Sequence, residues 1–272
     1  MSRDWKNTGL YQEFNQDDAD TRVERFIEAA AKLTVEFLED QDAFWHWDGH
    51  KHVAELTSGK LSNFFANCTP IFTHPGIQKD IAHALCEKLV RSVYVGMDKF
   101  LGKPAGYHGQ PRILTDDRLF KTHPNRWVVG SAMGSIGLAQ SIASVLGQGW
   151  KAAFADKGGD GMELKRFDLG EAPMVLLCED VFTTGGTIKS TIMAVEKKHE
   201  DVLFVPEVPT IINRNPGYSF QVKQGGPGFH FPALITKVAE TWDDVTSLPE
   251  RMKGCVPIRP KVGWKKLTTA ML

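Results

Sequence analysis

Two adjacent carboxylates, Glu179 and Asp180, are the residues of this chain whose setting points most clearly to chemistry. They follow an apolar run, residues 174 to 178, and precede a small polar turn; residues 174 to 187 read M-V-L-L-C-E-D-V-F-T-T-G-G-T. An apolar run of this length, bounded by turn residues, is typical of a strand buried on both faces of a parallel sheet. Ionised carboxylates accept hydrogen bonds, so the pair can bind sugar hydroxyls but not a phosphate.

The turn after the acids offers donors for an anion. A helix is expected from residue 188 to 198, and the first N–H groups of such a helix lack partners and attract negative charge. Threonine hydroxyls add donors, while glycines let the backbone close around a phosphate. An ordinary turn would explain the glycines, but not two acids beside a threonine cluster. The turn therefore predicts a ribose 5-phosphate site, formed by Thr183, Thr184, Gly185, Gly186 and Thr187.

The elements that must position these residues alternate along the chain. Such alternation predicts an α/β fold, with a mostly parallel sheet flanked by helices. Residues 44 to 70 are expected to form strands and loops, and the chain after residue 216 is expected to be irregular. Strands are expected at residues 127–129, 152–155, 174–178, 202–205 and 210–213, and helices at residues 20–38, 77–89, 136–146 and 188–198.

Composition excludes several other classes of protein. The chain has 272 residues and a formal net charge of −1, with no long basic run, which argues against nucleic acid as a partner. Four scattered cysteines give neither a disulfide framework nor a metal-ligand spacing. Residues 1 to 20 are polar and acidic and lack the apolar core of a signal peptide, and no run approaches the ~20 apolar residues of a membrane helix. A cytoplasmic enzyme is expected. His46, His50 and His52 lie close together, but their mixed spacing favours a polar loop over a zinc site.

The run from 174 to 187 resembles the phosphoribosyl-pyrophosphate (PRPP) signature of type I phosphoribosyltransferases. Four further segments resemble the orotate branch of that family, in family order. They are E-L-T-S-G-K-L-S-N-F-F-A-N-C at 55–68, V-G-S-A-M-G-S-I at 129–136, F-A-D-K-G-G-D-G-M-E-L-K-R-F at 154–167 and I-N-R-N-P-G at 212–217. A fifth segment, residues 241 to 261, resembles the C-terminal end of one subgroup of that branch. The second of these segments corresponds to the pyrophosphate loop and the third to a mobile loop. The resemblance covers roughly residues 55 to 261.

The resemblance implies a PRPP site built from three segments. Glycosyl transfer from PRPP develops positive charge on the ribose and negative charge on pyrophosphate, so catalysis consists mainly of positioning and charge stabilisation. Lys157 is expected to act on the leaving group, with Glu179 and Asp180 beside the ribose. The three loop cations could instead belong to a solvated hairpin, and the pyrophosphate loop could be a tight helix entry. The PRPP-binding residues are then Glu179, Asp180, Val181, Phe182, Thr183, Thr184, Gly185, Gly186 and Thr187, with Ala132, Met133, Gly134, Lys157, Lys165 and Arg166.

A base site is implied at the end of a different strand. Arg214 matches a carboxylate such as that of orotate, because its guanidinium donates two parallel hydrogen bonds. Lys60 could complement an anionic base, although a surface lysine is nearly as good an explanation. Phe64 and Phe65 alternate faces if extended, so one of them is expected to flank the base and the other to be core. Thr183 completes the expected base-binding set.

Several features depart from the family pattern. Ser131 replaces the usual proline of the pyrophosphate loop and Ser135 replaces a glycine. The loop at residues 154–167 has no histidine, which other orotate enzymes carry there. The stretch from 96 to 126 is longer than the usual link. Fold and PRPP binding survive these changes, while the identity of the base is less firmly fixed by them.

The chain is accordingly expected to transfer the phosphoribosyl group of PRPP to orotate, giving orotidine 5′-monophosphate and pyrophosphate. Mg²⁺ is expected to arrive with PRPP, without direct protein ligands and with Asp180 reached only through water. The expected organisation is an N-terminal helix and hood at 1–70, a catalytic core at 71–215 and an irregular C-terminal segment at 216–272 that packs on both. A homodimer is implied, without nucleic acid or membrane. Alternatives are another nucleobase, or a PRPP-sensing regulator without turnover.

Overall fold

The computed structural model describes residues 44–47, 49, 51–56, 58–100, 112–113, 120, 122–131, 133–147, 149–159, 161–216, 220–221, 228–260, 262–263 and 267. The helix expected at residues 20–38 and Ala132 of the pyrophosphate loop lie outside these residues, as does much of the stretch from 96 to 126. Among the described helices, none is both long enough and apolar enough to span a bilayer.

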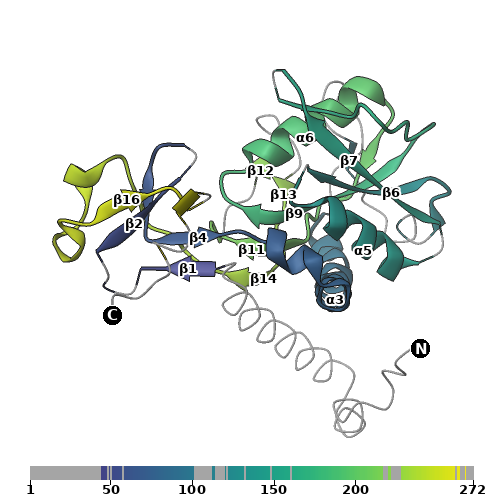
Figure 1. Cartoon of the computed structure of the whole chain (residues 1–272). Helices are drawn as coiled ribbons and strands as arrows, with labels where there is room; N and C mark the ends of the chain where they lie inside the picture. Colours follow the sequence, from purple (N-terminus) through teal and green to yellow (C-terminus); the bar gives the residue numbers. More distant parts are fainter. Residues whose placement is uncertain are drawn as a thin grey trace, which may run out of the picture.

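A mixed sheet, almost entirely parallel, forms the centre of the molecule (Figure 1). Its last strand, β8, is antiparallel to its neighbour, and β10 (Leu203–Phe204) pairs in parallel with both the first half of β9 and β5 (Arg112–Ile113). The main order is β14 (Ala233–Thr236), β11 (Thr210–Asn213), β9 (Met174–Phe182), β6 (Arg126–Ser131), β7 (Trp150–Lys157) and β8 (Met162–Glu163).

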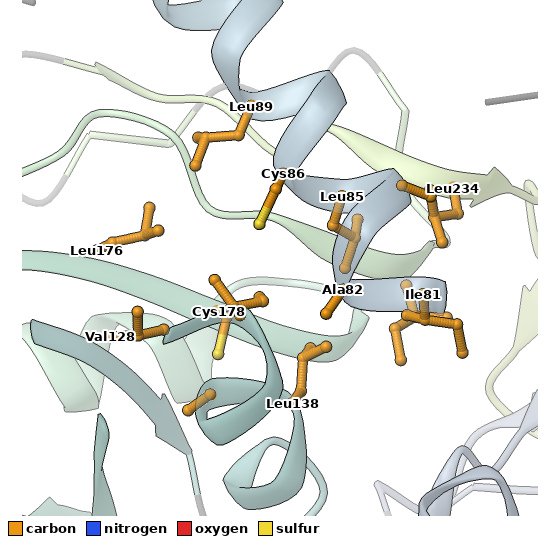
Figure 2. Close-up of a cluster of buried hydrophobic side chains, with 14 of the residues drawn as sticks. Ile81, Ala82, Leu85, Cys86, Leu89, Val128, Leu138, Leu176, Cys178 and Leu234 are labelled. Carbon is orange, nitrogen blue, oxygen red and sulfur yellow. The ribbon is translucent and has the colours of Figure 1, made fainter. Parts of the chain in front are cut away.

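Helices cover both faces of this sheet, because β9 is apolar on both faces. Met174, Leu176 and Cys178 belong to one buried cluster, together with side chains of α3 (Pro75–Phe100) and α5 (Ile136–Leu146) (Figure 2). The alternate β9 residues belong to a second cluster with α6 (Gly186–Lys198). This two-residue alternation follows from the pleat of a strand. It leaves the carboxyl ends of the parallel strands as the edge where polar side chains can gather.

A second, smaller sheet lies beside the core and joins distant parts of the chain (Figure 1). Its own small apolar clusters include Val53, Leu61 and Met252. A two-stranded ribbon, β1 (Phe44–His46) with β4 (Phe64–Ala66), adjoins it in sequence. The smaller sheet, called the hood below, has the order β15 (Thr241–Trp242), β3 (Leu61–Ser62), β2 (His52–Glu55) and β16 (Val256–Ile258).

Shorter elements complete the described chain. A two-stranded ribbon pairs β12 (Phe220–Gln221) with β13 (Gly228–Phe229). Short 3₁₀ helices lie at η3 (Thr69–Thr73), η4 (Val245–Ser247) and η5 (Glu250–Met252). The predicted α/β class, with a mostly parallel sheet, flanking helices and a small hood, is confirmed.

Two elements differ from the sequence prediction. The strand expected at residues 174–178 continues to Phe182, because its last residues pair with β11. Glu179 and Asp180 therefore lie within the strand rather than after it. The segment after residue 216, expected to be irregular, supplies β14, which pairs in parallel with β11 and extends the core sheet. The C-terminal part of the chain thus contributes to the core as well as to the hood.

Candidate active site at the carboxyl edge of the sheet

Glu179 is buried at the end of β9, with 8% of its surface exposed. Ser131, the last residue of the neighbouring strand β6, donates a hydrogen bond to Glu179 Oε2 over 2.9 Å. The Ser131 hydroxyl also lies 3.3 Å from Thr191 Oγ1 of α6, which in turn donates to the carbonyl of Thr187 over 2.9 Å. Burial and then the charge of Asp180 raise the pKa of Glu179 well above its ordinary value, while the bond from Ser131 lowers it.

Asp180 is held against the turn between β6 and α5. Its backbone N–H donates to Ser135 Oγ over 3.1 Å, and its own carboxylate accepts the N–H of Val181 over 2.9 Å. A Cβ atom on Gly134 would lie 2.1 Å from Asp180 Oδ2, so the carboxylate occupies the space that any other residue would need. Gly130 is restricted in the same way, because a Cβ there would lie 2.3 Å from the carbonyl oxygen of Ser135.

The hydroxyl of Ser135 bonds to β9 rather than to the helix that Ser135 precedes. It stands at the N-cap position of α5, yet its side chain makes no bond to that helix. Its hydroxyl instead accepts the Asp180 N–H, and its carbonyl approaches the Cys178 thiol at 4.0 Å. The serine therefore joins the turn to β9. Met133, in the same turn, is 82% exposed.

The threonine-rich turn leads directly into α6. Gly185 adopts the left-handed conformation, with φ 76°, which a residue with a Cβ disfavours. The helix begins at Gly186, and no side chain caps its first N–H groups. Thr183, Thr184 and Thr187 are exposed around this helix start. Unpaired N–H groups and exposed hydroxyls at one helix N-terminus provide donors for a phosphate.

The acids and the turn are thus neighbours, as the sequence predicted from their order. Val181 is half-buried and Phe182 is buried, with its ring stacked on Phe231 at 3.8 Å between centroids. Phe182 therefore belongs to the core beneath the turn, although it was predicted among the PRPP-binding residues. Its backbone remains close to the site, because its carbonyl accepts the N–H of Arg214 over 2.9 Å.

The loop between β7 and β8 is a hairpin. Lys157 is exposed at the end of β7 and pairs in register with Met162, and the Gly158 N–H donates to the Gly161 carbonyl over 2.7 Å. Arg166 bonds to Asp156 Oδ2 at 3.1 Å, and Lys165 Nζ lies 3.4 Å from Glu163 Oε2.

The two further cations of this segment therefore already have acidic partners on the hairpin itself. Among the described residues, no carboxylate pairs with Lys157. Lys157 is accordingly the best candidate of the three for an incoming anion.

Arg214 lies at the end of β11, across the sheet edge from the hairpin. Its Nη2 donates to Ser62 Oγ over 3.1 Å and to the Phe64 carbonyl over 3.5 Å, and its guanidinium lies 5.1 Å from the centre of the Phe64 ring. Its Nε is buried without a hydrogen-bond partner among the described atoms, and burial lowers the pKa of the guanidinium. A half-buried cation without a carboxylate partner in the described part of the chain is suited to an anionic ligand.

The other predicted base-site residues are placed differently. Phe64 is 1% exposed and packs edge-on against Phe44 at 4.8 Å, so it is mainly a core residue. Phe65 is half-buried. Lys60 is exposed and pairs with Asp243 at 2.7 Å. The structure therefore brings Lys60 to a surface ion pair of the hood, which agrees with the surface-lysine alternative.

Some residues of this edge had no predicted role. Ser62 is fully buried, accepts a bond from Arg214, and donates to the Glu240 carbonyl over 3.0 Å. Ser131 and Ser135 could be noticed only as departures from the loop pattern. Nothing in the sequence signals Thr191, because its contact with Ser131 depends on how α6 packs on the sheet.

The described residues contain no ready-made metal centre. No group of three or more histidine, cysteine or acidic side chains there could hold a metal ion. The carboxylate of Asp180 is half-buried at the edge of the site and offers oxygen atoms, the ligands that Mg²⁺ prefers.

No protein-family model matches the chain. Curated relatives are nevertheless found, among them several orotate phosphoribosyltransferases. An orotate phosphoribosyltransferase of Thermoanaerobacter sp. (strain X514) is 29% identical over 190 residues, which cover 69% of this chain and 77% of the relative. That of Desulforamulus reducens is 27% identical over 189 residues, covering 69% and 77%.

Solved structures of orotate phosphoribosyltransferases are also similar to this chain. The orotate phosphoribosyltransferase of Mycobacterium tuberculosis H37Rv in complex with inorganic phosphate is 16% identical with a TM-score of 0.44, and the match covers 78% of this chain and 96% of that one. The resemblance predicted from the motifs is confirmed by the curated relatives: this chain is similar to the orotate phosphoribosyltransferases, and its fold is a mostly parallel sheet with helices on both faces.

Proposed function

We propose that this protein transfers the 5-phosphoribosyl group of PRPP to orotate, producing orotidine 5′-monophosphate and pyrophosphate. The observation that carries the proposal is the carboxyl edge of the sheet, where an acid pair and an open helix start lie on β9 and α6 and a half-buried arginine follows the adjacent strand β11. The names of the curated relatives support the same reaction.

The phosphate and ribose of PRPP are proposed to bind where β9 ends and α6 begins. The 5-phosphate takes the N–H groups at the start of α6 and the hydroxyls of Thr183, Thr184 and Thr187. Gly185 and Gly186 allow the backbone to approach it. The ribose hydroxyls then lie beside Asp180, whose carboxylate accepts their hydrogen bonds and faces the positive charge that develops on the sugar.

The pyrophosphate is proposed to lie at the turn between β6 and α5, and the base at the end of β11. Met133 and Gly134 offer backbone N–H groups to pyrophosphate, and Ala132, which lies outside the described residues, remains part of the proposed pyrophosphate loop from the sequence alone. Lys157 stabilises the charge that grows on the leaving oxygen as the bond to C1 of ribose breaks. Arg214 binds the orotate carboxylate and so orients the ring nitrogen that forms the new bond to C1. Lys165 and Arg166 contribute only if the hairpin rearranges, since both already have acidic partners.

Mg²⁺ fits this arrangement as an ion that enters with PRPP. Mg²⁺ usually keeps several waters and is bound through substrate phosphates and one or two carboxylates. No side chain is assigned as a direct ligand, and the Asp180 carboxylate would hold one of the waters. When bound, the ion neutralises charge on pyrophosphate.

The protein is further proposed to work in the cytoplasm as a homodimer. The dimer is what the resemblance to the orotate phosphoribosyltransferases implies.

A PRPP-binding regulator without turnover is the second candidate, and one observation bears on it. Lys157 is exposed and without a carboxylate partner in the described chain, as a group that acts on a leaving pyrophosphate requires. A sensor would need the phosphate turn and the acids but not this lysine. The observation favours the enzyme.

The experiment is to follow orotate by its ultraviolet absorbance after mixing with PRPP, Mg²⁺ and purified protein. We expect consumption of orotate that depends on PRPP and that fails in Asp180→Asn. Binding of PRPP without any loss of orotate would favour the regulator.

A further inference from the structure

Ser62 of the hood contacts Arg214 of the core, and its hydroxyl is used to its full capacity. The hydroxyl oxygen accepts a hydrogen bond from Arg214 Nη2 over 3.1 Å and another from the Phe64 N–H over 3.2 Å. The hydroxyl donates to the Glu240 carbonyl over 3.0 Å. A serine hydroxyl has one hydrogen and two acceptor lone pairs, so these three bonds account for all of them. Because the Glu240 carbonyl takes the hydrogen, a lone pair of Ser62 faces the guanidinium.

Ser62 lies within the paired strands of the hood sheet rather than on a loop. It is fully buried in β3, opposite Ala54 of β2 on one side and Thr241 of β15 on the other. The next residue, Asn63, is joined to Glu240 by two bonds of its own: the Asn63 N–H donates to the Glu240 carbonyl over 3.4 Å, and the Glu240 N–H donates to Asn63 Oδ1 over 2.9 Å. Paired strands hold a side chain more precisely than a loop does, and this pairing does not depend on the Ser62 hydroxyl.

Three contacts with β3 and β4 restrict the Arg214 guanidinium, and all three are with uncharged groups. Nη2 donates to Ser62 Oγ and, over 3.5 Å, to the Phe64 carbonyl, and the guanidinium lies 5.1 Å from the centre of the Phe64 ring. The buried Nε has no hydrogen-bond partner among the described atoms, and no carboxylate in the described part of the chain pairs with this cation. The side chain is therefore ordered while its positive charge stays available to an anion.

Order before binding lowers the cost of binding. An arginine side chain has several rotatable bonds, and the loss of their freedom on association opposes binding unless the chain is already held. We propose that Ser62 is a positioning residue of the base site, which holds the Arg214 guanidinium in place and leaves its charge for the carboxylate of the base. This proposal rests on the proposed function and deepens it. Ser62 itself contacts no substrate in this role and acts only through Arg214.

Removal of the Ser62 hydroxyl should disturb orotate rather than PRPP. We expect Ser62→Ala to raise the KM for orotate by about fivefold, the effect of ordering one long side chain, with little change in the KM for PRPP. Ser247→Ala is the matched control, because the Ser247 hydroxyl bonds to Asp244 within η4 and does not contact Arg214. It should leave both KM values unchanged. A wild-type KM for orotate in Ser62→Ala, or an equal rise in Ser247→Ala, would overturn the proposal.

A double-mutant cycle tests whether Ser62 acts through Arg214. In an Arg214→Ala background, Ser62→Ala should cause no further rise in the KM for orotate, because the guanidinium that it positions is gone. A general disturbance of the hood would instead cause the same rise in both backgrounds and would overturn the proposal. Ser62→Cys keeps nearly the volume of serine but offers only a weak acceptor, so it serves for the same comparison if Ser62→Ala does not fold.

A readout that does not need activity separates this proposal from the proposed function. In urea unfolding, Ser62→Ala should lower the midpoint by less in the Arg214→Ala background than in the wild type, because the contact between the two side chains is already missing there. Equal shifts in the two backgrounds would overturn the proposal, even in an active enzyme. Unequal shifts in a protein that does not consume orotate would reject the proposed function and retain Ser62 as the residue that holds Arg214.

Discussion

Asp180 and Gly134 show how closely single residues are fitted at the proposed site. The Asp180 carboxylate occupies the space beside Gly134, so the glycine is required by packing rather than by an unusual backbone angle. A methyl group at residue 134 would push the end of a short side chain, not the core.

We expect Gly134→Ala to lower kcat/KM for PRPP by about 100-fold, the range for loss of a preorganised electrostatic group, while the melting temperature changes little. Gly76→Ala is the matched control, because a Cβ there would meet nothing within 4 Å. Steady-state kinetics and thermal unfolding of both variants provide the check. Wild-type kinetics in Gly134→Ala would mean that the Asp180 carboxylate has no role at this position.

Glu179 makes stability depend on pH in a defined direction. Its pKa in the folded protein is raised well above the ordinary value of 4.5, by burial first and then by Asp180. The stability that its neutral form contributes is therefore complete below pH 4.5 and is lost as the pH rises toward the folded pKa. Glutamine cannot ionise. We expect Glu179→Gln to gain stability relative to the wild type as the pH rises from 4.5 to neutrality, measured by urea unfolding. A difference that does not vary with pH would contradict the raised pKa.

Substitution of Arg214 is expected to change the KM for orotate more than the KM for PRPP. We expect Arg214→Ala to raise the KM for orotate by about tenfold or more, since a charge-assisted pair is lost. Arg214→Lys should recover part of the loss, because an ammonium cannot form the two parallel bonds of a guanidinium. The KM for PRPP should change much less. A change confined to the KM for PRPP would mean that the two halves of the site are assigned wrongly.

The elements of the sheet explain why these residues meet. Parallel strands place their carboxyl ends at one edge, so β9, β6, β7 and β11 deliver their last residues there. The hairpin of β7 and β8 adds Lys157, and its return segment is held by α6, where Lys198 Nζ donates to the Phe167 carbonyl over 2.5 Å and to that of Leu164 over 3.2 Å. The segment that follows the hairpin is thus hydrogen-bonded to α6, the helix that follows the threonine-rich turn.

Lys157 is expected to act mainly in the transition state. Lys157→Ala should lower kcat and kcat/KM together, the pattern for an interaction made as charge develops on the leaving group. Lys151→Ala is the control on the same strand, because Lys151 lies at the other end, 4.3 Å from the centre of the Trp127 ring. Single-turnover kinetics would separate chemistry from product release. An effect confined to the KM for orotate would refute a role on pyrophosphate.

The sequence predicted the apolar strands and the order of the motifs, because both are local patterns. Residues 174 to 178 are apolar on both faces, and the acids and threonines follow them directly. It could not predict that β9 reaches Phe182, since that depends on pairing with β11. Nor could it predict β14 or the hood pairing of β3 with β15, which join residues far apart in the chain. The bonds of Ser131, Ser135 and Thr191 depend on the same long-range register.

At the scale of the whole molecule, the hood and the core meet through Arg214. Its side chain reaches from the end of β11 to Ser62 of the hood and to Phe64 of β4, and Ser62 in turn bonds to the Glu240 carbonyl near β15. The proposed base site therefore lies where the N-terminal and C-terminal hood strands come together with the core.

If the protein is a homodimer with active sites shared between subunits, two inactive variants should complement each other. If the hairpin of one subunit serves the partner's site, mixing inactive Lys157→Ala with inactive Asp180→Asn should restore part of the activity, because some mixed dimers contain one intact site. Sedimentation of the wild type should show a dimer at micromolar concentration. Monomers alone would contradict the dimer, and a dimer without recovery would place both residues of a site in one subunit.

The most direct test of the proposed activity is a comparison of acceptors. Purified protein is incubated with PRPP, Mg²⁺ and one nucleobase at a time (orotate, uracil, adenine, guanine or hypoxanthine), and pyrophosphate release is measured. The arginine at residue 214, half-buried and without a carboxylate partner among the described residues, predicts that orotate supports the fastest release. Faster turnover with any purine, or with uracil, would contradict the assignment of orotate as the substrate.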